Sequence, residues 1–69
     1  MWTVVYIAYN NSVAEELSNY LNDEGIMART HVLGFSKDGE PNQIEILVSE
    51  LEAEDALELI QAYLSEKVF

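Results

Sequence analysis

One histidine, one tyrosine and one glutamate could together carry acid–base chemistry in this chain. His31 is the only histidine among the 69 residues, and the strands predicted below place it on the same sheet face as Tyr6 and Glu45. Such a cluster could transfer protons, but no nucleophile and no oxyanion donors accompany it. We interpret it as a polar cross-strand arrangement on a half-exposed sheet and expect that the chain is not an enzyme.

A run of acidic residues near the end of the chain could be read as a site for a hard cation. Calcium takes about six to eight oxygen ligands that converge from a loop, whereas carboxylates on a helix surface point apart. Acidic side chains also stabilise the start of a helix through its dipole. We therefore expect a solvated helix start and no metal site. The residues concerned are Glu50, Glu52, Glu54, Asp55 and Glu58.

The corner Asn10–Ser12 joins an apolar run to a helical pattern, and the N–H groups of a helix start can hold an anion. This corner has no glycine to admit a phosphate. Ser12 and Glu15 form a capping box that satisfies the free donors internally, with Asn11 as the alternative cap. Glu15 and Glu16 would also repel an anion. We predict that the corner is a structural joint.

The composition excludes several classes of function. The chain has 3 Lys+Arg against 13 Asp+Glu, a formal net charge of −10, so nucleic acids and anionic membrane surfaces would repel it. It has no cysteine and therefore no disulfide or thiolate chemistry. No stretch approaches the roughly 18 apolar residues of a membrane span, and the N-terminus lacks the basic region of a secretory signal. We expect a cytoplasmic protein that binds neither nucleic acid nor membrane.

The elements that position these residues follow from hydrophobic periodicity within one predicted domain, residues 1–69. Strands are predicted at Trp2–Tyr9, Ile26–Phe35 and Gln43–Ser49, where β-branched and aromatic residues are enriched. The polar connection Gly34–Asn42 contains an Asp-Gly pair and a proline, which are turn signals. The second and third strands should therefore form a hairpin.

Two helices are predicted, one between the first two strands and one after the third. In the first helix apolar residues recur at helical spacing from Val13 to Leu21, and Gly25 marks its end. The second helix begins at Ser49, which can form a capping box with Glu52. Its apolar stripe comprises Leu51, Ala56, Leu57, Ile60, Tyr63 and Leu64.

The element order is strand, helix, strand, strand, helix. A right-handed crossover leaves a gap between the first two strands, which the third strand can fill antiparallel to both. The pattern predicts an α+β, ferredoxin-like β-α-β-β-α fold with both helices on one face of an antiparallel sheet. Only Lys67–Phe69 remain for a final strand, which is absent or very short, and the pattern leaves open whether Val68 and Phe69 begin it.

Many of these residues also match a family pattern. The pattern is a strand ending in Val-Tyr-x-Ala-x-Asn, a helix rich in Ala and Leu, Gly-Ile before the next strand, and an acidic helix after a Val-terminated strand. The matching residues are Val5, Tyr6, Ala8, Asn10, Leu17, Leu21, Gly25, Ile26, Val48, Asp55, Ala56, Leu57 and Ile60. The chain thus resembles a small bacterial domain family of unknown function, described as prokaryotic signal-transducing proteins. Tyr9 departs from the pattern, because relatives often carry proline there.

The resemblance implies a bacterial cytoplasmic setting and no established activity, although some relatives carry a glutamate decarboxylase name. A pyridoxal-phosphate decarboxylase needs a Schiff-base lysine in a pocket of roughly 300 Å³ or more. The two lysines of this chain, Lys37 and Lys67, lie in a polar loop and near the chain end. Neither has a glycine-rich phosphate cradle nearby. We expect neither this activity nor any cofactor.

The strongest functional signal is the sheet face that points away from the helices. A contiguous apolar patch of more than a few hundred Å² usually marks an interaction site, and Trp and Tyr are favoured interface anchors. Strand alternation predicts this interaction face from the residues Trp2, Val4, Tyr6, Met27, Arg29, His31, Leu33, Glu45 and Leu47.

We expect a non-catalytic regulatory or protein-interaction module. It should bind a protein partner or a second copy of itself, through this face or through the unpaired edge of the first strand. The alternative is a small-ligand-sensing regulatory domain with the ligand at a dimer seam.

Overall fold

The three strands form one antiparallel sheet with the last strand in the middle, in the order β1-β3-β2. The computed structural model describes residues 1–67. Its elements are β1 (Trp2–Ala8), α1 (Asn11–Asp23), β2 (Arg29–Phe35), β3 (Pro41–Ser49), the short 3-10 turn η1 (Glu50–Glu52) and α2 (Ala53–Lys67). The predicted α+β, ferredoxin-like β-α-β-β-α arrangement is confirmed. Val68 and Phe69, the candidate start of a final strand, lie outside the described residues.

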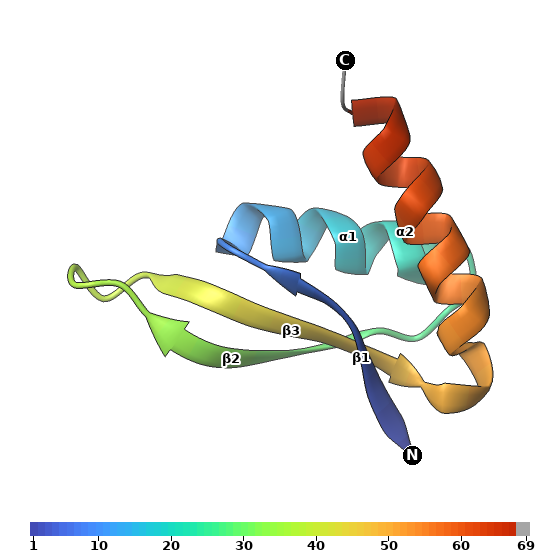
Figure 1. The fold of residues 1–69 in the computed structure, drawn as a ribbon, viewed down its shortest axis with the longest axis horizontal. Helices are drawn as coiled ribbons and strands as arrows, with labels where there is room; N and C mark the ends of the chain where they lie inside the picture. Colours follow the sequence, from blue (N-terminus) through green and yellow to red (C-terminus); the bar gives the residue numbers. More distant parts are fainter. Residues whose placement is uncertain (68–69) are drawn as a thin grey trace.

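Both helices pack against the same face of the sheet (Figure 1). Alternate residues of β3, namely Ile44, Ile46 and Val48, are buried on this face. In the middle of the core, Leu17 and Leu21 of α1 cluster with Ile46 and Val48. The core on the α2 side is completed by Ala56 and Ile60. Each fully buried large aliphatic side chain contributes about 2 kcal/mol, so this single layer of side chains holds the helices on the sheet.

The hairpin between β2 and β3 is confirmed, and its loop is shorter than the predicted polar connection. The Ser36 N–H donates to the Glu40 carbonyl at 2.8 Å, and the Gly39 N–H donates to the Ser36 carbonyl at 3.0 Å. These bonds enclose a loop of three residues, 37–39. Its last residue, Gly39, has φ +86°, the left-handed conformation that is typical of this position in a three-residue hairpin loop. The Ser36 hydroxyl donates to Asp38, which together with a backbone hydrogen bond holds the pKa of that exposed carboxyl below its ordinary value.

Helix α1 begins with a different cap from the predicted one. The side chain of Asn10, whose backbone is extended, accepts a hydrogen bond from the Val13 N–H at 2.8 Å. The expected cap at Ser12 or Asn11 is therefore wrong, because the helix begins at Asn11 and the Asn10 side-chain oxygen reaches the free Val13 N–H in its first turn. Ser12 lies exposed in the first turn. The corner acts as a structural joint, as predicted, but through Asn10.

The end of α1 follows the prediction at Gly25. The Gly25 N–H donates to the Asn22 carbonyl at 3.0 Å and the Ile26 N–H to the Leu21 carbonyl at 2.9 Å. These two bonds define a Schellman motif, and Gly25 takes φ +92° within it. The chain then continues without regular structure to Ala28, whose N–H donates to the Asn22 side chain at 3.1 Å. Strand β2 therefore starts at Arg29, three residues later than predicted.

A β-bulge in β1 changes the predicted faces of the strand. The register pairs Val4 with Leu47 and Tyr6 with Ile46, so Val5 is an extra residue on the β1 side. Side-chain alternation slips by one residue at such a bulge. Tyr6 consequently packs against the helix-side core. Its predicted place on the opposite face is wrong, and Ile7 occupies that face instead.

The second predicted capping residue is Ser49, and its hydroxyl accepts from the Leu51 N–H at 3.3 Å. The turn that it caps is η1, and α2 starts only at Ala53. Across the top of the core, the Tyr63 hydroxyl donates to Glu16 at 2.8 Å, which links α2 to α1. The C-terminal end of α2 extends well beyond the sheet (Figure 1). None of the helices within residues 1–67 has the length and apolar character needed to cross a membrane.

Candidate functional site

The sheet face opposite the helices is formed by residues that stand in rows across the three strands. One row joins Val4, Leu47 and Arg29, and the next joins Ile7, Glu45 and His31. By alternation along their strands, Trp2 and Leu33 face the same side. We call this surface the open face. Its members are Trp2, Val4, Ile7, Arg29, His31, Leu33, Glu45 and Leu47.

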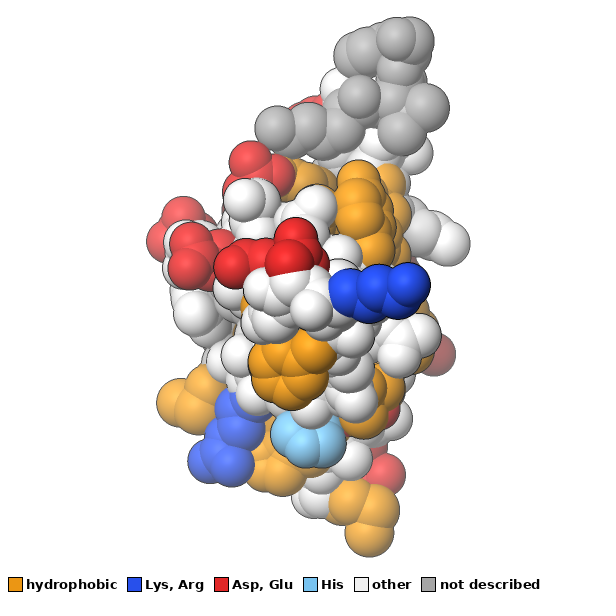
Figure 2. All heavy atoms as spheres, turned by 90° about the vertical axis from the view of Figure 1, so that its left-hand side faces the viewer, with side chains coloured by type: hydrophobic (Ala, Val, Ile, Leu, Met, Phe, Trp, Pro, Cys, Tyr) orange, Lys and Arg blue, Asp and Glu red, His pale blue; other side chains and the backbone are white. Residues whose placement is uncertain are grey.

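Large apolar side chains of the open face remain accessible. Trp2 is 38% exposed, Val4 41%, Ile7 51% and Leu33 49%. Leu47 lies between them on the central strand and is half-buried. Figure 2 shows hydrophobic side chains beside a histidine and a basic side chain in the lower part of the view, where the sheet lies. The open face therefore exposes several large apolar side chains, with Arg29, His31 and Glu45 among them.

The polar groups of the open face contact one another within it. The Arg29 guanidinium lies over the Trp2 ring, 4.3 Å from its centroid, a cation–π contact that also orders the indole. His31 Nδ1 lies 3.2 Å from Glu45 Oε1. The predicted approach of His31 to Glu45 is confirmed. Arg29 thus covers part of the Trp2 ring, while Val4, Ile7 and Leu33 stay exposed.

The group of Tyr6, His31 and Glu45, interpreted above as a polar cross-strand arrangement, lacks its third member. Tyr6 packs on the helix side of the sheet, so the hydroxyl cannot join His31 and Glu45. The imidazole is 66% exposed and the carboxylate 22%, so the pair sits on an open surface. General acid–base catalysis needs a positioned substrate in a site that excludes water. An exposed pair of this kind is typical of a polar cross-strand contact.

One predicted residue lies outside the open face, and one residue of the open face was not predicted. Met27 is 67% exposed, but it precedes β2 and so does not belong to the ladder of the open face. Ile7 was missed, because strict alternation from Trp2 places it among the core residues. The acidic residues of η1 and the start of α2 are exposed or half-buried. Residues 1–67 contain no group of three or more acidic or histidine side chains that could hold a metal ion.

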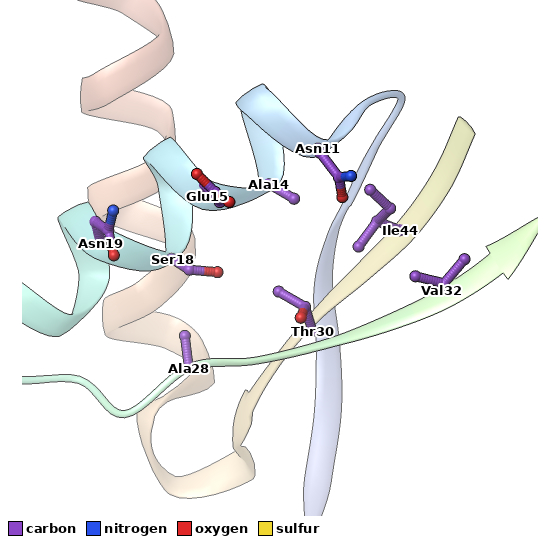
Figure 3. A pocket seen from close by; sticks show the side chains of 9 residues that line it. All are labelled: Asn11, Ala14, Glu15, Ser18, Asn19, Ala28, Thr30, Val32 and Ile44. Atoms are coloured by element: carbon purple, nitrogen blue, oxygen red, sulfur yellow. The ribbon is translucent and has the colours of Figure 1, made fainter. Parts of the chain in front are cut away.

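A hollow that the sequence did not predict lies between α1 and β2. It has a volume of about 280 Å³. One stripe of α1 and alternate residues of β2 form its walls, and Ile44 of β3 lies at its end (Figure 3). The signal in the sequence is the small size of Ala14 and Ser18 opposite Ala28, which only the fold brings together. Lys37, one of the two lysines considered for a Schiff base, is not among its lining residues.

Comparison of the chain with protein-family models, with curated proteins and with solved structures finds no match. The resemblance to the bacterial signal-transducing family therefore stays a prediction.

Proposed function

We propose that this chain is a non-catalytic protein-interaction module that associates with a second copy of itself through the open face. The resemblance noted above and the acidic composition support a regulatory role in a bacterial cytoplasm. The distribution of charge favours a second copy of the chain as the partner that binds the open face.

The observation that carries the proposal is that the open face has no net charge in a strongly acidic protein. Arg29 and Glu45 cancel on this face when His31 is neutral, so the formal net charge of −10 lies wholly on other residues. A basic partner would be drawn to the acidic helix side. Two copies avoid most of their mutual repulsion only by meeting face to face at the sheet.

The size of the open face predicts a weak dimer. Strands of seven residues are about 23 Å long and three strands are about 14 Å across, which gives a footprint of roughly 300 Å². Stable complexes bury about 800 Å² per partner. Even with corrugated side chains the open face falls short of that, so the dimer should form and dissociate readily. The outer edge of β1, which has no charged side chain and no strand partner within residues 1–67, could extend it.

The test is sedimentation equilibrium of the wild-type chain at low and high salt. Association should strengthen as salt rises, because screening removes the repulsion between exposed acids. Val4→Lys should weaken the dimer about tenfold or more, since it places a charge in the middle of an apolar contact. Leu51→Lys is the matched control, because Leu51 is 92% exposed and lies outside the open face.

The only tryptophan of the chain, Trp2, supplies an independent readout on the same face. Its emission should shift to shorter wavelength as the protein concentration rises, in the wild type and in Leu51→Lys but not in Val4→Lys. A monomer at both salts up to millimolar concentration would overturn the dimer. Equal weakening by the two lysine substitutions would remove the open face as its interface.

Ligand sensing is the second candidate function, and one observation favours it. Face-to-face pairing would enclose the His31–Glu45 pair of each copy in the seam, where a small polar ligand would find both a donor and a carboxylate. Such a ligand stabilises the folded dimer by mass action. A thermal-shift screen with a panel of metabolites separates the candidates, because a module that binds only protein gives no shift.

A further inference from the structure

Strand β2 presents its outer edge to solvent next to a helix. The strand lies at the margin of the sheet, with β3 on one side and no strand on the other within the described part of the chain. Alternate backbone N–H and C=O groups along such an edge are free to pair with another strand. The edge contains no proline, so every residue along it keeps its N–H group.

The hollow described above runs along this edge with matched walls. Its α1 wall extends from Asn11 to Asn19, about 12 Å at 1.5 Å per residue. Its β2 wall extends from Ala28 to Val32, about 13 Å at 3.3 Å per residue. Figure 3 shows Asn11 beside the Val32 end and Asn19 beside the Ala28 end. We call this hollow the α1–β2 groove.

The groove stays open because helix α1 does not cover β2. Thr30 and Val32 pair with the buried residues Ile46 and Ile44, so they point to the helix side of the sheet. Both are nevertheless exposed, and Val32 keeps 37% of its surface. The facing helix residues Ala14 and Ser18 are too small to reach them. The helix-side surface of the sheet, which a helix would normally cover, is therefore exposed over about four residues of β2.

Two polar side chains that line the groove have no hydrogen-bond or ion-pair partner among the described residues. The Ser18 hydroxyl oxygen is buried and makes no hydrogen bond to any described residue, and it points into the space between α1 and β2 (Figure 3). A buried hydroxyl without a partner is unfavourable, because it has lost its hydrogen bonds to water without replacing them. Glu15 lines the same groove, and none of its described neighbours forms an ion pair with it. Among the described residues, no lysine or arginine lines the groove.

We propose that the α1–β2 groove binds an extended peptide segment of another protein, which adds to β2 as a further strand and carries a lysine or arginine toward Glu15. Strand addition uses the free backbone groups of the edge for affinity and side-chain pockets for specificity. The small residues of the groove admit a small hydroxyl side chain such as threonine, which can hydrogen-bond the Ser18 hydroxyl. The site is separate from the open face and does not depend on the proposed dimer.

A second copy of this chain is a poorer occupant of the groove. Pairing β2 with β2 would bring two acidic α1 helices together, each from a chain of net charge −10. A small amine alone would leave the edge of β2 unpaired. A basic extended peptide satisfies Glu15, Ser18 and the backbone edge together.

The test is a titration of the ¹⁵N-labelled full chain, followed by NMR chemical shifts. The probe is an acetylated and amidated hexapeptide of alternating valine and threonine with one central lysine. Shifts should map to residues 28–32 and to the facing stripe of α1. Glu15→Lys should weaken binding about tenfold or more. Glu58→Lys, the matched control, makes the same charge change at an exposed site on α2 and should retain most of the affinity.

Backbone methylation of the probe tests strand addition itself. Two versions carry N-methyl groups on alternate residues, in one phase or the other. The version whose methyl groups face β2 should lose binding, whereas its partner should keep it. Replacing the lysine of the probe by glutamate should also abolish binding to the wild type and restore it to Glu15→Lys.

Four results would overturn the proposal: no shifts at millimolar peptide, equal binding of both methylated versions, equal binding by butylamine alone, or shifts confined to the open face. The last result would favour the open face as a peptide site instead. If sedimentation equilibrium shows only a monomer, the peptide-binding proposal for the groove is unaffected, so the two proposals are tested separately.

Discussion

At the scale of single residues, Asn10 is the side chain that determines where α1 begins. Its oxygen satisfies the Val13 N–H, one of the donors that a helix start leaves free. Asn10→Ala should lower the free energy of unfolding by about 1 kcal/mol. Urea unfolding at neutral pH measures this change directly.

Ser12→Ala is the matched control for the cap. Ser12 is exposed within the first turn, where alanine has the better helix propensity. The control should therefore be neutral or slightly stabilising. A loss at Ser12 equal to that at Asn10 would show that the capping box Ser12–Glu15 operates in solution after all.

Ile7 and Tyr6 show at the same scale why part of the open face could not be predicted. Their chemical types fit either side of a sheet, so only the position of the bulge at Val5 assigns them. No residue of the local sequence marks that bulge, because Val5 is as typical of a regular strand as its neighbours. The face assignments before the bulge, Trp2 and Val4, follow from alternation alone.

At the scale of elements, the end of α1 depends on a backbone conformation rather than on space. Nothing lies within 4 Å of a Cβ built on Gly25, and its φ is +92°. Gly25→Val should cost about 1–3 kcal/mol through backbone strain alone. Gly25→Asn should cost less, because asparagine tolerates the left-handed region. Thermal unfolding of the two variants compares them.

An unchanged melting temperature for Gly25→Val would mean that the loop from α1 to β2 rearranges without loss, and that the Schellman motif contributes little. The expected loss of stability involves the whole connection from α1 to β2, since Ile26 is held by the same motif and lies buried in the core.

Elements with local signals could be predicted from the sequence, whereas features made by distant pairs could not. Gly25 and the Asp38-Gly39 pair announce their turns within a few residues. The α1–β2 groove arises from Ala14 and Ser18 meeting Ala28 across the fold. Small residues on a helix have no single structural meaning until the neighbouring element is known.

At the scale of the whole molecule, the net charge of −10 should make stability depend on salt. Acids gather on η1 and α2 and along α1, and their repulsion is relieved on unfolding. Sodium chloride should therefore stabilise the monomer by about 1 kcal/mol, which raises the melting temperature of a domain of this size by roughly 4–8 °C. The scan is run at a concentration below that of association. A melting temperature that falls with salt would contradict the prediction.

The bulge in β1 also affects how any relative of this chain would have to be aligned with it. Val5 is the one residue of β1 without a counterpart on β3. A version of the chain that lacks it would keep every other pairing and would read as a strand of unbroken alternation. Side chains before Val5 and side chains after it therefore alternate between the two faces of the sheet in opposite phase. An alignment that places no gap inside β1 would assign Trp2 and Val4 to the wrong side.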